Sequence, residues 1–405
     1  MRIIYLHQYF NTPAMAGGTR SYEMARRLVR AGHEVHLVTT WREESDRRHW
    51  FVTDEAGITV HWLPLRYSNH MGFSERLRSF IRFAAASTIK AVSLPGDVVF
   101  ASSTPLTIAI PGMLASAWKR IPLVFEIRDL WPDVPIAMGV LRNPFAIRLA
   151  KWLERITYRR SSRIVALAPG MKEAVVAGGT AADLVTVIPN GCDFDVFGTA
   201  AGDPVTLPGA SASDLGILYL GTMGIANGVT WIPELASALR TLDEGSRVRF
   251  YLIGDGQQRR DAEALAARLG VLGNTVHFLG TMPKHEVAGW LAAAGATIIT
   301  YDGPAIVYRD SVSNKFFDSI AAGKPVFANY RGFATLTAEE AGAGWILDRD
   351  PAVAARTLSR IASDPAAIAA AGQRALSLAH ERFGRDELAV RLESVLLQAV
   401  EDRGG

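Results

Sequence analysis

The chain has 405 residues, 49% of them hydrophobic and 20% charged, which excludes a disordered or fibrous protein and predicts two packed domains. Its single cysteine, Cys192, excludes an internal disulfide and a cysteine-rich zinc site and favours a reducing, cytoplasmic location. The net charge of +3 is unevenly shared, because residues 1–195 carry 24 Lys and Arg against 17 Asp and Glu. An anionic partner is therefore expected at the first half.

The first half alternates predicted strands and helices. A strand at 3–6, a loop containing Gly17 and Gly18, a helix at 21–31 and a strand at 35–39 form a βαβ unit, which implies a parallel α/β sheet. Ligands of such sheets bind at the carboxyl ends of the strands, where this glycine pair lies. Further strands are expected at 58–63, 98–101, 123–127, 164–168 and 185–189.

Residues 98–118 form an uncharged run that is long enough to cross a bilayer. Polar residues at 102–105 and the pair Pro111-Gly112 interrupt it. These interruptions favour a strand, a polar loop and a buried helix over a membrane span.

Two basic stretches, 74–90 and 142–163, place Arg and Lys beside apolar residues at helical spacing. This pattern is typical of helices that lie on an anionic membrane surface. We interpret 74–90 in this way, whereas for 142–163 we favour a helix that packs on the core and exposes a solvated basic face.

The segment LVFEIRDLWPDV, residues 123–134, ends a predicted buried strand with several charged side chains. Glu126, Arg128 and Asp129 come at or just after the carboxyl end of the strand, which indicates part of an active site. The alternative is a structural bridge between Arg128 and a carboxylate that holds a loop.

The second half repeats the theme after a Pro, Gly and Ser-rich linker at 198–213. Strands are predicted at 216–220, 249–253, 276–279 and 297–301, and the first three run into glycine loops at Gly221, Gly254 and Gly280. Together these loops are suited to binding one nucleotide.

A helix predicted to begin at Ser313-Asn314 is suited to binding an anion. The unpaired N–H groups of its first turn would face a phosphate, and the ammonium of Lys315 would add a full charge. Asp310 and Asp318 flank this helix start. The alternative to an anion-binding site is an ordinary capped helix that binds no ligand.

The motifs above come together in a family resemblance. The segment IPNGCDFDVF, 188–197, resembles the interdomain signature of retaining glycosyltransferases of the GT4 family. That family has the GT-B fold, two Rossmann-like domains facing each other across a cleft. EIRDLWPD, 126–133, and SNKFFDSIAA, 313–322, are similar to a bacterial branch that transfers amino-deoxysugars such as N-acetylfucosamine in surface polysaccharide and lipopolysaccharide synthesis.

The resemblance implies an acceptor-binding domain at 1–197, the linker at 198–213 and a donor-binding domain at 214–383. An amphipathic helix at 384–405 would return towards the first domain. The implied activity is transfer of a HexNAc or amino-deoxyhexose from a nucleotide diphosphate sugar, UDP by family habit, to a polyprenyl-diphosphate-linked or other glycan acceptor. The enzyme would work at the inner leaflet of the cytoplasmic membrane, and no nucleic acid is expected to bind.

The resemblance and the strand-end positions assign roles to particular residues. Asp318 would hold the ribose and Asp310 would approach the transferred sugar, while Asp129 and Arg128 would act at the reacting groups. Arg20 and Glu126 are expected to contact the acceptor or the pyrophosphate. The expected donor-binding residues are Gly17, Gly18, Gly221, Asn227, Gly254, Gly280, Asn314, Lys315 and Asp318.

This chain departs from the family pattern in two ways. Asp310 and Asp318 stand where the family has a pair of Glu, and Met223 and Asn227 stand roughly where it has a phosphate-binding Arg and Lys. Arg128, Arg309 or Lys315 would then neutralise the diphosphate. A rival interpretation is a catalytically weak or inactive nucleotide-sugar-binding scaffold subunit.

We expect the reaction to need neither a metal nor a cofactor. The D-x-D sequence at Asp348 and Asp350 precedes Pro351 and a predicted helix, where an N-cap explains Asp350 better than a metal ion does. The nine histidines show no ligand spacing, and His7 is interpreted as a packing or loop residue.

Overall fold

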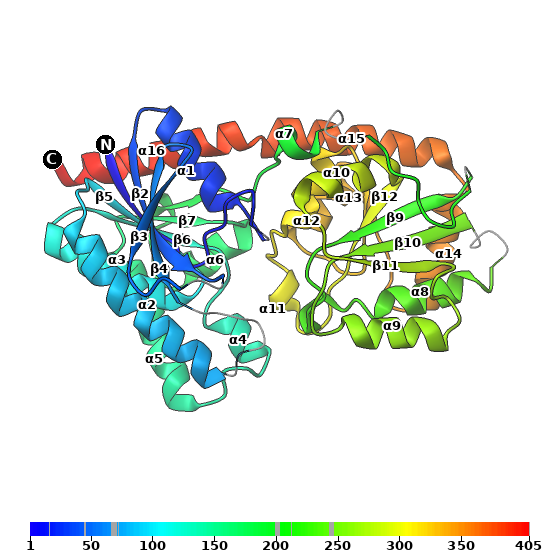
Figure 1. The fold of residues 1–405 in the computed structure, drawn as a ribbon, viewed down its shortest axis with the longest axis horizontal. Coiled ribbons are helices and arrows are strands. Elements are labelled where there is room, and N and C mark those ends of the chain that lie inside the picture. Colours follow the sequence, from blue (N-terminus) through cyan, green and yellow to red (C-terminus); the bar gives the residue numbers. More distant parts are fainter. Residues whose placement is uncertain are drawn as a thin grey trace. The chain divides into compact units, whose positions relative to one another are not determined.

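A computed structural model describes residues 1–15, 17–43, 46–65, 71, 73–198, 203–211, 213–242 and 247–404. The chain divides into two compact units (Figure 1). The first comprises Met1–Pro189 together with Arg385–Gly405, and the second comprises Asn190–Gly384. The chain therefore leaves the first unit once and returns to it at α16.

The first unit is an eight-stranded sheet in the order β3-β4-β2-β1-β5-β6-β7-β8, and every neighbouring pair is parallel except β3 and β4. Its strands are β1 (Arg2–Leu6), β2 (Glu34–Trp41), β3 (Phe51–Glu55), β4 (Ile58–Pro64), β5 (Val98–Ser102), β6 (Leu123–Ile127), β7 (Arg163–Ala166) and β8 (Val185–Val187). Its helices are α1 (Arg20–Arg30), α2 (Phe73–Ser93), α3 (Ala109–Lys119), α4 (Asp133–Ala137), α5 (Pro144–Arg160), α6 (Pro169–Ala177) and α16 (Arg385–Gly404), with 3₁₀ turns η1 (Leu106–Ile108) and η2 (Ala182–Leu184).

The central strands of this sheet are mostly apolar because helices cover both faces, and their polar residues Ser102 and Glu126 lie at the carboxyl ends. Ile3 of β1 pairs with Val35 on one side and with Val98 on the other. The uncharged run 98–118 forms β5, η1 and α3, so the predicted strand, loop and helix are confirmed, although Leu114 and Trp118 of the helix are exposed and not buried. No helix among the described residues is both long and apolar enough to cross a membrane.

The edge strand β3 was not predicted. Its residues alternate between partly buried and exposed, and it reaches β4 through a hairpin in which Ala56 and Gly57 both have positive φ. A single half-exposed strand of five residues gives little periodic signal, which explains the omission.

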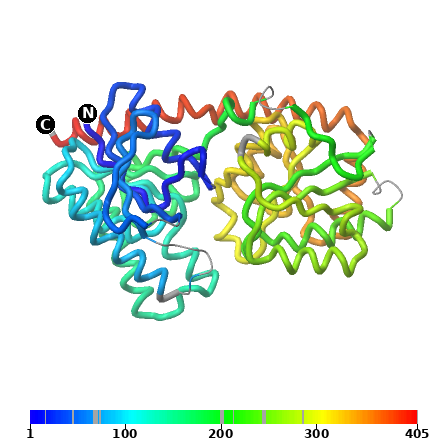
Figure 2. The backbone as a smooth tube through the Cα atoms, viewed as in Figure 1, coloured from blue at the N-terminus to red at the C-terminus, as the bar shows by residue number. Residues whose placement is uncertain are grey.

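Helix α16 packs on the first unit, with Leu388, Leu392 and Leu396 in the same core cluster as the central strands. Figure 2 shows this red helix beside the blue N-terminal segment. Val390 of the same helix faces away from this core and is 60% exposed.

The second unit is a six-stranded, fully parallel sheet in the order β11-β10-β9-β12-β13-β14. Its strands are β9 (Leu215–Leu220), β10 (Val248–Ile253), β11 (Val276–Gly280), β12 (Ala296–Ile299), β13 (Val326–Ala328) and β14 (Gly344–Ile346). Its helices are α7 (Phe194–Phe197), α8 (Trp231–Leu239), α9 (Arg259–Arg268), α10 (Lys284–Ala293), α11 (Ala305–Tyr308), α12 (Asn314–Ala321), α13 (Phe333–Glu340), α14 (Pro351–Ala362) and α15 (Pro365–Phe383), with the 3₁₀ turn η3 (Ile225–Asn227).

Much of the segment predicted as a linker packs on the second unit. Tyr251 donates a hydrogen bond from its hydroxyl to the carbonyl of Pro208 at 2.8 Å, and the amide of Val205 donates to Gly289. Residues 199–202 and 212 of the predicted linker lie outside the described residues.

Candidate active site

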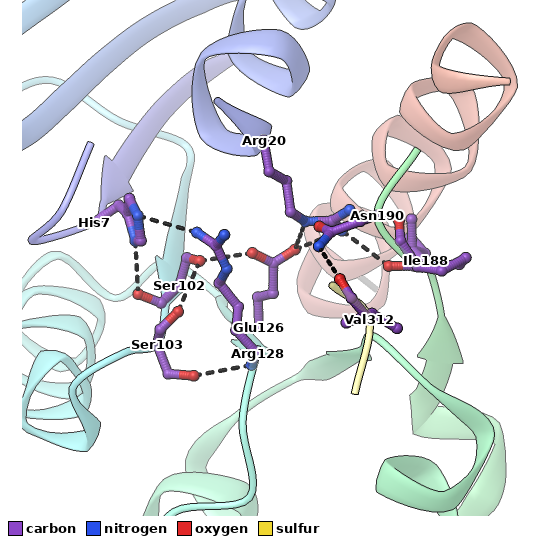
Figure 3. Close-up of polar contacts among 10 residues, drawn as sticks. His7, Arg20, Ser102, Ser103, Glu126, Arg128, Ile188, Asn190 and Val312 are labelled. Atoms are coloured by element: carbon purple, nitrogen blue, oxygen red, sulfur yellow. Dashed lines mark hydrogen bonds and ion pairs between the residues drawn. The ribbon is translucent and has the colours of Figure 1, made fainter. Parts of the chain in front are cut away.

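A fully buried ion pair lies at the carboxyl edge of the first sheet. Arg20, the first residue of α1, donates to Glu126 from Nε and Nη2 at 3.1 and 2.8 Å, and both side chains are 0% exposed. Arg20 also donates to the carbonyls of Ile188 and Pro189 (Figure 3). Ser102 donates to the second carboxylate oxygen of Glu126 at 2.6 Å.

This pair joins α1, β5, β6 and the chain that leaves β8. Burial alone would raise the pKa of Glu126, but the charges of Arg20 and Arg128 and the hydrogen bonds from Arg20 and Ser102 lower it. Arg20 and Glu126 were expected to touch the acceptor or the pyrophosphate. Their burial leaves no side-chain surface for a ligand, so we treat both as residues that position the edge.

Arg128 is held differently from the cation of the buried pair. Its backbone N–H donates to the Ser103 hydroxyl at 3.0 Å, and its guanidinium lies 3.1 Å from Nε2 of His7. Among the described residues, Arg128 forms no ion pair with a carboxylate. The bridge to a carboxylate that the sequence suggested is made by Arg20.

Asp129 follows Arg128 and is exposed at the same edge. The surrounding protein keeps water from the Asp129 carboxyl and so raises its pKa, and the charge of Arg128 opposes this by a smaller amount. Asp133, four residues further on at the start of α4, pairs with Lys151 of α5 at 3.0 Å. Of the four predicted charged residues at this edge, Arg128 and Asp129 are thus the two whose side chains have surface available for a ligand.

The predicted glycine loop after β1 is folded tightly on Asn11. Gly17 has φ +127°, and a Cβ at this position would lie 2.6 Å from Nδ2 of Asn11. That amide nitrogen donates to the carbonyl of Gly18 at 3.2 Å. Gly17 is therefore required by backbone geometry, whatever it binds.

In the second unit, the loops after β9, β10 and β11 are packed backbone against backbone. The amide of Gly221 donates to Ile253, and the amide of Gly254 donates to Gly280 at 2.6 Å. A Cβ on Gly254, whose φ is +139°, would lie 1.9 Å from the carbonyl oxygen of Gly221. The three predicted glycines thus come together, but the N–H groups of Gly221 and Gly254 are already used.

Asn227 is also used inside its own loop. Its side-chain oxygen accepts a hydrogen bond from the amide of Gly224 at 3.1 Å, which caps the η3 turn. The sequence predicted that Asn227 binds the donor. In the structure its side-chain oxygen instead accepts a hydrogen bond within its own loop.

Helix α12 begins at Asn314, as the motif predicted, without a side-chain cap from Ser313. Lys315 reaches from its first turn to the loop after β9, where Nζ donates to the Tyr219 hydroxyl and to the carbonyl of Thr222, at 2.5 and 3.4 Å. Nζ also lies 4.0 Å from the centre of the Tyr219 ring. Part of Lys315 is exposed, yet burial lowers its pKa to about 7.

The two predicted carboxylates differ in their surroundings. Asp310 is 6% exposed and accepts a hydrogen bond from Arg309 at 2.9 Å. Asp318, in the middle of α12, is half-buried. Of the D-x-D pair, Asp350 caps α14 by accepting from the amides of Ala352 and Val353, as predicted.

Comparison with solved structures identifies the fold of the protein. Sucrose-phosphate synthase from Thermosynechococcus elongatus is similar with a TM-score of 0.75 and 16% identity over 98% of both chains. HepE of Anabaena in complex with UDP is similar with a TM-score of 0.69 and 18% identity, over 98% of this chain and all of the other. The two parallel α/β units are the Rossmann-like domains of the GT-B fold.

Sequence comparisons identify the family. Residues 16–191 match the glycosyl transferase 4-like domain, and residues 214–364 match the domain called glycosyl transferases group 1. The chain thus carries two glycosyltransferase family domains, of the GT4 and GT1 type.

Two curated relatives are more similar in sequence than these structures. The 2-deoxystreptamine glucosyltransferase of Streptomyces kanamyceticus is 26% identical over 62% of this chain, and the match spans only 60% of that relative. The D-inositol 3-phosphate glycosyltransferase of Streptosporangium roseum is 27% identical over 95% of this chain and 89% of its own length.

Proposed function

We propose that the protein is a retaining, metal-independent glycosyltransferase that uses a UDP-sugar, with the donor diphosphate bound at the start of α12. The observation that carries this proposal is Lys315, a cation without a carboxylate partner among the described residues, set beside the loop after β9. The UDP complex of the similar HepE structure supports the choice of nucleotide.

The start of α12 supplies two kinds of positive charge to a leaving diphosphate. The first N–H groups of the helix point out of its N-terminus, and Lys315 adds an ammonium that burial has partly stripped of water. Stabilised negative charge on the leaving group is what lowers the barrier to glycosyl transfer. Asp129 and Asp310 are our candidates for the carboxylates that touch the donor sugar or the acceptor.

A matched pair of lysine variants tests the donor site. Lys315→Met should weaken UDP binding about tenfold or more, because a charged hydrogen bond is lost. Lys324 is the control, because burial lowers its pKa as well. It lies at the amino end of β13, away from the carboxyl ends of the strands, and donates to the carbonyl of Ala292. Lys324→Met should leave UDP binding unchanged.

The measurement is the thermal unfolding of the full chain with UDP, GDP, ADP and TDP, followed by titration with the best nucleotide. UDP alone should shift the transition, by ~2.7 kcal/mol at 100 times its dissociation constant. Binding without turnover of any UDP-sugar would favour the scaffold subunit. Turnover that excess chelator abolishes would overturn metal independence.

We also propose that the acceptor is lipid-linked and that the enzyme works at the inner-leaflet surface. Of the large apolar side chains that the structure exposes, most lie on three neighbouring helices of the first unit, α2, α3 and α5 (Figure 1). They are Leu77, Ile81, Ile89, Leu114, Trp118, Phe145, Leu149 and Trp152, and we call them the apolar helix surface.

Helix α5 contributes the most aromatic part of this surface. Phe145, Leu149 and Trp152 are 74%, 52% and 56% exposed, and their spacing places them on one face of the helix. Arg148 and Arg155 are exposed on the same face. The solvated basic face that we favoured for this stretch therefore also carries aromatic residues, a combination that suits anionic lipid headgroups.

Vesicle sedimentation tests this surface. The full chain should bind phosphatidylglycerol vesicles more strongly than phosphatidylcholine vesicles, and added salt should weaken binding. The double variant Phe145→Ser/Trp152→Ser should lose most of the binding. The control Val52→Ser removes an apolar side chain, 54% exposed, from the edge strand β3 and should bind like the wild type. Equal binding by both variants would contradict the proposal.

The transferred sugar is proposed from the motif resemblance alone. EIRDLWPD and SNKFFDSIAA support a HexNAc or amino-deoxyhexose donor in the synthesis of a surface polysaccharide such as lipopolysaccharide. Turnover with UDP-N-acetyl sugars but not with UDP-glucose would agree with this assignment.

A further inference from the structure

His7 is the first residue after β1 and is 4% exposed. Its backbone N–H donates to the carbonyl of Val38, so the ring is anchored at the carboxyl edge of the sheet. Its Nδ1 lies 3.3 Å from the carbonyl oxygen of Ser102, and its Nε2 lies 3.1 Å from Nη1 of Arg128 (Figure 3).

These two neighbours fix the protonation state of the ring. A carbonyl oxygen can only accept a hydrogen bond, so Nδ1 of His7 carries the proton. A guanidinium can only donate one, so Nε2 is unprotonated and acts as the acceptor. The ring is therefore neutral. Burial, followed by the charge of Arg128, lowers the pKa of His7 to about 3, in agreement with this geometry.

Because His7 is neutral, it orients Arg128 without cancelling its charge, whereas a carboxylate would cancel it. Arg20, held by Glu126 at the same edge, is fully buried and its charge is cancelled. Arg128 receives from His7 an acceptor that fixes the direction of its guanidinium and that, unlike a carboxylate, does not neutralise its positive charge. Ser103 fixes its backbone through a 3.0 Å hydrogen bond, so both ends of the residue are held.

We propose that His7 is a positioning residue whose unprotonated Nε2 orients the Arg128 guanidinium, with its charge intact, for contact with a phosphate group bound at this edge of the first unit. This inference rests on the proposed function and adds a cationic phosphate contact on the first unit. Arg128 keeps further N–H donors for the ligand, because a guanidinium has five in a planar fork.

Three substitutions at His7 separate its possible tasks. His7→Gln keeps a neutral acceptor near the position of Nε2, His7→Phe keeps the ring size but removes both nitrogens, and His7→Glu keeps an acceptor but cancels the charge of Arg128. The probe is inorganic diphosphate, titrated calorimetrically into the full chain, so that the result does not depend on finding the donor sugar.

We expect Arg128→Gln to weaken diphosphate binding about tenfold or more. His7→Phe and His7→Glu should each cause several-fold loss, and His7→Gln should restore most of the affinity. In the Arg128→Gln background, His7→Phe should cause no further loss, because His7 would act only through Arg128. An equal further loss would overturn the proposal and leave His7 a structural residue.

Nitrogen NMR of the ring provides an independent readout. The wild type should show one neutral tautomer, protonated on Nδ1, from pH 5 to 9, and a doubly protonated ring would overturn the proposal. If UDP binds but diphosphate affinity is insensitive to both His7→Phe and Arg128→Gln, the inference fails while the proposed function stands. If UDP and diphosphate both fail to bind, the proposed function fails with it.

Discussion

The carboxyl edges of the two sheets, which carry the candidate site residues, are stabilised in different ways. At the first edge, buried charged and polar side chains fix the local structure: Arg20 and Ser102 hold Glu126, and His7 holds Arg128. At the second edge, the backbones of Gly221, Gly254 and Gly280 pack against each other. Lys315 reaches this loop cluster and donates to the Tyr219 hydroxyl. The first edge is thus specified by charge pairing and the second by the absence of side chains.

Breaking the buried pair should have the largest effect. Arg20→Met leaves the Glu126 carboxylate buried without its cation, which should destabilise the first unit by about 3–5 kcal/mol. The double variant Arg20→Met/Glu126→Leu should recover much of this loss, since no lone charge remains. Urea unfolding of the full chain, followed by tryptophan fluorescence, measures both.

The control for this comparison is the exposed pair of Arg2 and Asp97, whose side chains are 48% and 32% exposed. Arg2→Met should leave the unfolding midpoint almost unchanged, because water already solvates both charges. If Arg20→Met behaved like Arg2→Met, charge pairing would not be what specifies the first edge.

Adding one methyl group to the second edge should have the next largest effect. Gly254→Ala places a Cβ 1.9 Å from the carbonyl oxygen of Gly221 at a φ that L-residues rarely adopt, which should cost about 3 kcal/mol. UDP binding should be lost with it. Gly273→Ala is the control, because its φ is also positive, +73°, but nothing lies within 4 Å of the new Cβ.

Gly273→Ala should cost only about 1 kcal/mol, the strain of the left-handed backbone. Thermal unfolding of both variants provides the measurement. Equal losses would mean that backbone strain alone, and not the close approach of the two loops, makes Gly254 necessary.

The pH dependence of Lys315 should have the smallest effect and should act in two opposite directions. The folded pKa of about 7 lies below the ordinary 10.5, so the unfolded chain binds more protons between these values and stability rises with pH there. UDP binding should instead weaken as the pH rises through about 7, by about tenfold at most per pH unit. Calorimetric titration from pH 6 to 9 tests this, and a Lys315→Met variant with the same pH profile would rule out Lys315 as the cause.

The sequence was sufficient for the features that depend on local pattern. Apolar runs bounded by glycine predicted the buried parallel strands, and Ser313 and Asn314 marked the start of α12. The expectation that ligand-facing residues follow strands located Glu126, Arg128 and Asp129 at one edge. Applied to β1, the same rule would have singled out His7, which we had interpreted as a packing or loop residue.

Partner choice could not be predicted in the same way. Arg20 and Glu126 are 106 residues apart, and nothing local says that Glu126 pairs with Arg20 and not with the adjacent Arg128. Asn227 is similar, because its amide could face a ligand or cap its own turn, and only the fold of the loop decides. Such choices are made by packing between distant segments, which periodicity does not record.

The return of α16 to the first unit bears on how the protein is made. The first 189 residues supply every strand of the first sheet, yet the hydrophobic groove that Leu388, Leu392 and Leu396 fill stays uncovered until the chain beyond Arg385 has been translated. The second unit is contiguous from Asn190 to Gly384, so its last residue is translated just before α16 begins. During synthesis on the ribosome the second unit should therefore complete its core before the first, which leaves the nascent first unit as the natural client of a chaperone.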